Sequence, residues 1–270
     1  MTMQIIERGS GEPLILIPPL QGRWEYLRAT IEALATSCRV VTFSLCDEPS
    51  ARALFDPGQG IDSFAAQVQA VLDDRHLERA AICGVSFGGL IALRAAARMP
   101  ARVSALVLAS TPGPYFHLKP RHELYARAPW LFGAVFAAES PWRLRREIQI
   151  ALPDLAERRR FRREQLLTLL RAPLSLSRMA ARARSIAAHN RLADCALVAS
   201  PTLIIHGNPS LDFVVDAQAT AEYARLIRGA RLVTMDQTGH LGSITRPHDF
   251  AAIVHRFLNA SHRDSHHSAA

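Results

Sequence analysis

AAICGVSFGGLIALRAAA, at residues 80–97, passes from an apolar run to an Ala-rich segment through the pattern GVSFG at residues 84–88. The run is typical of a buried strand and the Ala-rich segment of a helix. A direct strand-to-helix turn is so tight that the positions two residues either side of Ser86 must be nearly free of side chain. The turn also places the serine at a helix N-terminus, where N–H groups and the helix dipole favour negative charge. The pattern indicates a nucleophilic Ser86, and the alternative is a glycine-rich turn that only packs a helix on a strand.

Apolar runs of the same kind recur along the chain, with amphipathic segments between them. Strands are predicted over residues 2–8, 13–18, 39–44, 79–85, 103–109, 201–207 and 230–235. Helices are predicted over residues 24–36, 62–75, 87–99, 216–228 and 247–259. Several runs are apolar at every position, as strands covered by helices on both faces must be. This alternation predicts an α/β fold class with a mostly parallel sheet and helices on both faces.

One long segment, residues 115–190, breaks the alternation because it contains amphipathic helical patterns and no convincing strand. We interpret it as a helical cap inserted into a core made of residues 1–114 and 191–260. The last ten residues, 261–270, are small and polar, and we expect them to be a disordered tail.

The composition excludes several classes of protein. Hydrophobic residues make up 49% of the 270 residues, which suits a globular chain. No window is apolar enough to span a bilayer, and the four cysteines are too widely spaced for a zinc site. We therefore expect a cytoplasmic protein with reduced thiols, no membrane span and no metal.

The net charge of +8 comes largely from arginines, many of them in the predicted cap. Consecutive arginines point around a helix, so a solvated basic surface is the simplest interpretation. No recognition-helix or aromatic-plus-basic strand pattern accompanies them. We expect no nucleic-acid partner.

A serine nucleophile needs a base and an orienting acid. His240 follows the last predicted strand, in a loop of the kind where sites form in open α/β sheets. His206 is its main rival, at the end of the preceding strand. Asp212 is the candidate acid, because it lies in the loop after that strand, whereas Asp216 is better explained as a helix N-cap.

The segments ILIPPLQG, VVTFSL, GVSFGG, HGNPSLD and TGHLG occur in the order found in the α/β-hydrolase superfamily, which this sequence resembles over nearly its whole length. The resemblance implies an eight-stranded, mostly parallel sheet with a helical cap inserted after the sixth strand. It also implies a Ser86–His240–Asp212 catalytic triad that needs no metal or organic cofactor.

The sequence departs from the family at Pro18-Pro19, where members usually carry His-Gly. Proline has no N–H, so one oxyanion donor is expected to be Leu20 or Gln21, and the other Phe87. The substrate pocket should lie between the cap and the carboxyl edge of the sheet, with Trp24, Phe87 and Gln21 as candidate substrate-binding residues.

These features predict a serine hydrolase that cleaves a carboxylic ester, thioester or lactone, or an activated carbon–carbon bond, through an acyl-enzyme on Ser86. Its partner would be a small molecule that carries a carbonyl group. Two alternatives stay open: an acyltransferase that uses the same intermediate, and a weakly catalytic small-molecule-binding protein of hydrolase fold.

Overall fold

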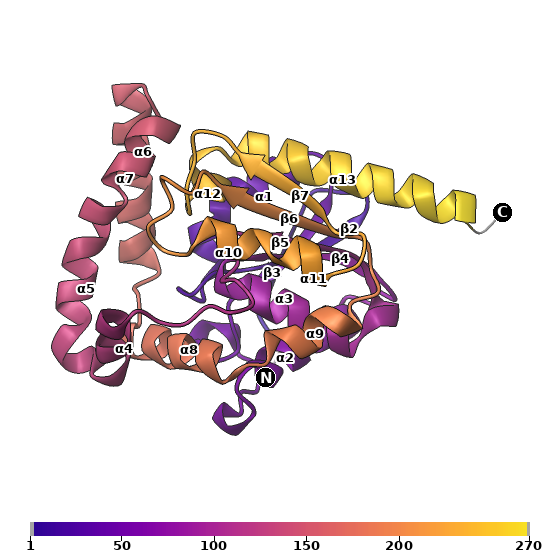
Figure 1. Cartoon of the computed structure of the whole chain (residues 1–270), viewed down its shortest axis with the longest axis horizontal. Helices are drawn as coiled ribbons and strands as arrows, with labels where there is room; N and C mark the ends of the chain where they lie inside the picture. Colours follow the sequence, from indigo (N-terminus) through magenta and orange to yellow (C-terminus); the bar gives the residue numbers. More distant parts are fainter. Residues whose placement is uncertain (1–2, 269–270) are drawn as a thin grey trace.

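A seven-stranded, mostly parallel sheet forms the centre of the computed structural model, which describes residues 3–268 (Figure 1). The strands are β1 (Ile5–Arg8), β2 (Pro13–Ile17), β3 (Arg39–Phe43), β4 (Ala80–Val85), β5 (Val103–Ala109), β6 (Thr202–Gly207) and β7 (Arg231–Met235). They lie in the order β1-β3-β2-β4-β5-β6-β7, and only the pairing of β1 with β3 is antiparallel. The parallel pairing brings the carboxyl ends of β2, β4, β5, β6 and β7 to one edge, as expected for a site-bearing edge.

The strand count corrects one expectation. Each of the seven apolar runs forms a strand, but the eighth strand implied by the family resemblance is absent from the described residues. The cap helices therefore follow β5 rather than a sixth strand.

Successive side chains along each strand point to opposite faces of the sheet and pack into two hydrophobic cores, one on each face. Ile15 and Ile17 of β2 point to the face covered by α2 (Ile61–Asp74), α3 (Phe87–Arg98) and α9 (Arg191–Leu197). Leu14 and Leu16 point to the face covered by α1 (Arg28–Leu34) and α13 (Pro247–Ser268). All four side chains are fully buried, which explains why the run has no polar position.

Two predicted helices are divided in the structure. The segment 24–36 forms the 3₁₀ turn η1 (Trp24–Leu27) followed by α1, and the segment 216–228 forms α10 (Ala217–Ala221) and α11 (Tyr223–Leu226). The remaining short elements of the core are η2 (Pro49–Ala51), η3 (Pro57–Gln59), η4 (Pro100–Arg102) and α12 (Gly242–Thr245).

The segment between β5 and β6 is helical, with no strand among its described residues. It contains α4 (Pro120–Arg127), α5 (Pro129–Arg143), α6 (Arg145–Ala151), α7 (Leu155–Arg171) and α8 (Leu176–Ala188), followed by α9. In Figure 1, α4 to α8 stand beside the sheet rather than on either of its faces. We call residues 115–190 the cap, although its status as a separate domain stays a prediction.

The C-terminal segment differs from expectation. Residues 261–268, predicted to be disordered, continue α13 as far as Ser268, and only residues 269 and 270 of the predicted tail lie outside the described residues. Ser261 is buried and its hydroxyl donates to the Phe257 carbonyl, so the helix still packs at this point.

No helix within residues 3–268 is both long and apolar enough to cross a membrane. The four cysteines are all buried and unpaired.

Candidate active site

Ser86 occupies the turn between β4 and α3, at the carboxyl edge of the sheet. Its φ is +53°, a conformation that side chains other than glycine rarely adopt and that often marks a functional site. The flanking glycines are required for close approach, since a Cβ on Gly84 would lie 2.1 Å from the Gly88 carbonyl oxygen. A Cβ on Gly88 would in turn lie 2.5 Å from the Ile17 carbonyl oxygen of β2. The glycine spacing read from the sequence is thus a steric necessity.

His240 lies in the loop between β7 and α12 and points at the serine. Its Nε2 is 3.1 Å from the Ser86 Oγ, a hydrogen-bonding distance. Gly239 allows this approach, because a Cβ there would lie 2.6 Å from the Leu211 carbonyl oxygen in the loop after β6. The two loops are therefore packed backbone to backbone, which brings Asp212 beside the imidazole.

Asp212 faces the other nitrogen of the His240 ring. Its Oδ1 accepts hydrogen bonds from the Val214 and Val215 N–H groups, each at 2.9 Å. Its Oδ2 lies 3.4 Å from the His240 Nδ1, and both atoms are buried with no other partner in the described residues. That distance is longer than an ideal hydrogen bond, which is common before a substrate binds. The structure thus brings Ser86, His240 and Asp212 together in a chain of contacts.

The pKa of His240 is raised, because nearby negative charges together affect it more than burial does. Burial, the largest single effect, lowers the pKa of the imidazole, but the Asp212 and Glu147 carboxylates together raise the pKa above its ordinary value. The site therefore favours a positively charged imidazole more than water does, although the ring is only 11% exposed.

The two residues predicted as oxyanion donors have backbone N–H groups without an acceptor in the described residues. The Phe87 N–H is at the first position of α3, where helix geometry leaves it without an intrahelical partner. Leu20 lies in the turn closed by the hydrogen bond from the Gly22 N–H to the Pro19 carbonyl, and its own N–H donates no hydrogen bond within the described residues. Both residues line the same cavity as Ser86.

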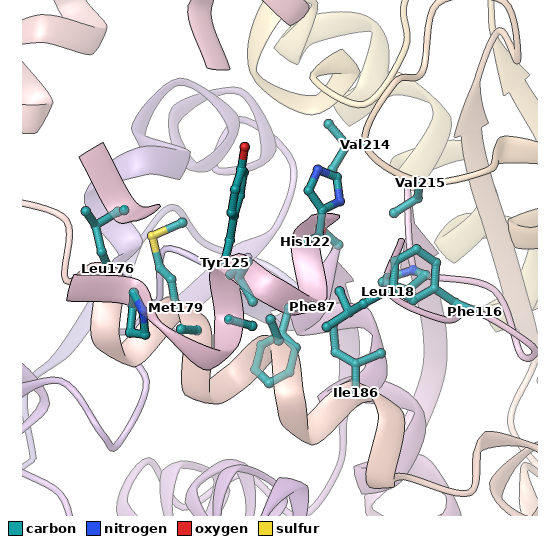
Figure 2. A pocket seen from close by; sticks show the side chains of 18 residues that line it. Phe87, Phe116, Leu118, His122, Tyr125, Leu176, Met179, Ile186, Val214 and Val215 are labelled. Carbon is teal, nitrogen blue, oxygen red and sulfur yellow. The ribbon is translucent and has the colours of Figure 1, made fainter. Parts of the chain in front are cut away.

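An apolar cavity of about 150 Å³ opens on Ser86, between the sheet edge and helices α4, α5 and α8 (Figure 2). Its other lining residues are Pro112, Phe116, Leu118, His122, Tyr125, Ala126, Pro129, Gly133, Leu176, Met179, Ala180, Ala183, Ile186, Val214 and Val215. Besides Ser86, only His122 and Tyr125 offer polar side-chain atoms. Burial lowers the pKa of His122, and the nearby Arg143 acts in the same direction, so the lining carries no formal charge at neutral pH.

Three of the residues singled out in the sequence lie elsewhere. Trp24 does not line the cavity: it packs on the core beneath α1 and α13, with the Arg28 guanidinium over its ring. Gln21 is likewise absent from the lining, and its Oε1 is buried without a partner in the described residues. His206 is held within the sheet by contacts to the Gly207 carbonyl and the Thr234 hydroxyl, so it is a packed histidine. Asp216 caps α10, as predicted.

Two charged residues of the cap reach the site, and sequence reasoning missed both. Glu147 of α6 is fully buried and accepts hydrogen bonds from the N–H groups on either side of His240. Arg182 of α8 is also buried and donates to the Leu20 carbonyl at 2.7 Å, while pairing with Asp47 and Glu48. Nothing in the local sequence separates these two from the many exposed charges of the cap, since their partners are 92 to 162 residues away.

No group of three potential metal-ligating side chains occurs in the part of the chain that the structure describes.

An open parallel sheet that presents a serine at a strand-to-helix turn, with histidine and aspartate on the two following loops, defines a recognisable class of α/β protein. Comparison with known families agrees: the model of the alpha/beta hydrolase fold matches residues 12–247, and the chain belongs to this family.

Individual relatives are similar to this chain at moderate identity. A pimeloyl-[acyl-carrier protein] methyl ester esterase of Aromatoleum aromaticum is 33% identical over 191 residues, 65% of this chain and 72% of the esterase. A 2-hydroxymuconate semialdehyde hydrolase of a Pseudomonas species is 29% identical over 93% of this chain and 88% of that enzyme. The crystal structure of an enol-lactonase from Burkholderia xenovorans superposes with a TM-score of 0.76 at 20% identity, covering 95% of this chain and 96% of the lactonase. The two relatives are named as a methyl ester esterase and as a hydrolase, and the structural neighbour supports the fold.

Proposed function

We propose that this protein is a serine hydrolase that cleaves carboxylic esters, thioesters or lactones with an apolar acyl part, through an acyl-enzyme on Ser86. The observation that carries the proposal is the 3.1 Å contact between the Ser86 Oγ and the His240 Nε2 beside an apolar cavity. A nucleophile within hydrogen-bond reach of a base that is itself oriented by an acid is the arrangement needed for acyl transfer.

In the proposed mechanism, the imidazole carries its resting proton on Nδ1, toward Asp212, so Nε2 accepts the proton of the Ser86 hydroxyl. The Oγ then attacks the substrate carbonyl, and His240 becomes positively charged. The same proton passes to the leaving alcohol or thiol as the tetrahedral intermediate collapses to the acyl-enzyme. Water repeats the sequence on the acyl-enzyme and restores the free serine.

Asp212 and the two N–H donors would stabilise the charges that develop. The Val214 and Val215 N–H groups fix one oxygen of Asp212 and leave the other directed at the imidazole. The Leu20 and Phe87 N–H groups would hold the oxyanion, and each such donor typically contributes about 10²–10³-fold to kcat. Pro18-Pro19 would restrict the loop that presents Leu20.

The lining of the cavity supports an apolar acyl group. A substrate with a charged group at this position would meet no complementary charge, because the arginines of the cap do not line the cavity. The methyl ester esterase activity in the name of one relative agrees with this chemistry.

Cleavage of an activated carbon–carbon bond is the second candidate. It is favoured by the similarity to a 2-hydroxymuconate semialdehyde hydrolase over nearly the whole of both chains. The apolar lining is a poor match for polar keto-acid substrates, so we rank ester hydrolysis first.

A fluorophosphonate probe and a panel of p-nitrophenyl esters from acetate to decanoate test the proposal. We expect the probe to label wild-type protein and not Ser86→Ala, and ester turnover to be lost in the same variant. Absence of labelling under conditions that label a control esterase would contradict the proposal.

The same assays distinguish the two alternatives. Burst release of one equivalent of p-nitrophenol without turnover would indicate the binding-protein alternative. Faster release with an added alcohol, together with a new ester product, would indicate the acyltransferase.

A further inference from the structure

Glu147 stands out because a carboxylate from the cap is buried against the loop that carries His240. It lies in α6, and its side chain is fully inaccessible to solvent. Its Oε1 accepts two backbone hydrogen bonds, from the Gly239 N–H at 2.8 Å and from the Leu241 N–H at 2.5 Å. These are the peptide groups that flank His240, so a single oxygen atom fixes the backbone on both sides of the imidazole.

Hydrogen bonding alone does not explain the residue type, since a neutral side-chain oxygen could accept the same two bonds. A buried carboxylate is costly, and burial raises the pKa of Glu147 to about 6 despite the opposing effects of the two N–H groups and of His240. The other oxygen, Oε2, is buried with no partner in the described residues. Because the buried charge reduces the stability of the fold, we infer that it contributes to function.

The charge has a defined neighbour. Two carboxylates, Asp212 and Glu147, raise the pKa of His240 and oppose the effect of its burial. Asp212 contacts the ring directly, whereas Glu147 holds the backbone. A negative charge near the imidazole stabilises its protonated form, which the proposed reaction generates in the transition state.

We propose that Glu147 is a positioning residue, supplied by the cap, that holds the His240 loop against Ser86 and favours the charged imidazole during acyl transfer. This inference rests on the proposed function. It makes the cap part of the catalytic arrangement, since the residue that fixes the base belongs to α6. It also predicts that movement of α6 would change the rate of acyl transfer.

Two variants separate the two roles. Glu147→Gln keeps an oxygen for the Gly239 and Leu241 N–H groups but removes the charge, and Glu147→Leu removes both. Glu164→Gln is the matched control, because Glu164 is an exposed cap glutamate that pairs with Arg160. For each variant, the fraction of fluorophosphonate-labelled protein counts the active sites. The values of kcat and KM per active site are then measured from about pH 5 to pH 9 with one p-nitrophenyl ester.

For Glu147→Gln we expect the acid limb of the kcat/KM profile to move about half a unit or more to lower pH, because His240 loses a neighbouring negative charge. For Glu147→Leu we expect kcat per active site to fall about 10- to 100-fold, with KM within about threefold, because the base is misplaced. Glu164→Gln should match wild type in both respects.

A merely structural role would reduce the number of labelled sites or the melting temperature while leaving kcat per active site and the pH profile unchanged, and that result would overturn the inference. If Glu147→Leu does not fold, an unshifted profile for Glu147→Gln overturns the role of the charge. Failure of the proposed function would appear differently, as absence of labelling and turnover in the wild-type protein itself.

Discussion

At the scale of single residues, the geometry of the site depends on two positions beside Ser86 that have room for glycine alone. Ser86 keeps a positive φ because Gly84 and Gly88 allow the backbone of β4, α3 and β2 to close around it. The turn places the Ser86 Oγ at the carboxyl edge of the sheet, in the wall of the cavity, and the surrounding packing maintains the strained backbone.

Gly84→Ala should therefore prevent stable folding or destabilise the protein by more than about 3 kcal/mol, because the added Cβ meets a backbone carbonyl that cannot move away. Chemical denaturation measures the effect. Gly58→Ala is the control, since its Cβ would approach only the Asp56 side chain, and it should cost less than about 1 kcal/mol. Equal stability of the two variants would contradict the account of the turn.

Glu147 has a stability signature that is independent of activity. Its pKa is about 6 in the folded protein against an ordinary 4.5, so the folded state holds this proton more tightly than the unfolded state. The stabilisation is complete below about pH 4.5 and is lost as the pH rises through about 6, to the extent of about 2 kcal/mol.

Glu147→Gln removes this titration. The difference in unfolding free energy, wild type minus variant, should thus fall by about 2 kcal/mol between pH 4.5 and pH 7. Urea denaturation at each pH checks it. A difference that is constant, or that increases with pH, would show that the Glu147 carboxyl is not destabilised by burial.

At the scale of elements, α8 connects the cavity to the loops that follow β2 and β3. One face of the helix lines the cavity through residues such as Met179 and Ala183, while Arg182 reaches the Leu20 carbonyl and the Asp47 and Glu48 carboxylates. Gly22 leaves room for this guanidinium, since a Cβ there would lie 2.2 Å from its Nη1.

Ala183→Phe should fill part of the cavity and reduce kcat/KM for an octanoate ester by at least about tenfold, with acetate hydrolysis within about twofold of wild type. In wild type, kcat/KM should rise up to about fourfold per added methylene until the cavity is full. Ala181→Phe adds the same ring on the exposed side of α8 and is the control. Parallel losses for both esters in Ala183→Phe would mean that the acyl group lies elsewhere.

Removing the buried cation of α8 should destabilise the protein. Arg182→Met leaves Asp47 and Glu48 without their buried counter-charge, at a cost of about 3–5 kcal/mol. Arg160→Met, at an exposed ion pair, should change stability by less than about 1 kcal/mol. Adding Asp47→Asn and Glu48→Gln to Arg182→Met should restore part of the lost stability, because the two unpaired charges are then removed. If stability is not restored, the loss comes mainly from the contact between Arg182 and the Leu20 carbonyl.

At the scale of the whole molecule, local pattern predicted the architecture well. Each of the seven apolar runs became a strand, because a strand buried on both faces must be apolar at every position. Ser86, His240 and Asp212 could be selected because each follows a strand whose carboxyl end meets the same sheet edge. Their catalytic roles stay predictions, but the structure brings them into contact.

Features set by distant contacts could not be predicted. Glu147 and Arg182 resemble other cap charges until the cap folds over the sheet edge. Trp24 was a candidate substrate-binding residue, yet it packs against the core covered by α1 and α13 and does not line the cavity. The composition of residues 261–268 suggested disorder, whereas α13 continues to Ser268.

The most direct test of the central claim is to trap the covalent intermediate. Wild-type protein is mixed with a p-nitrophenyl ester, quenched in acid within the burst and digested, and the peptides are analysed by mass spectrometry. The account predicts one added acyl mass on the peptide that contains Ser86, absent from Ser86→Ala. Rapid turnover with no adduct on this peptide, or with the acyl group on another residue, would contradict it.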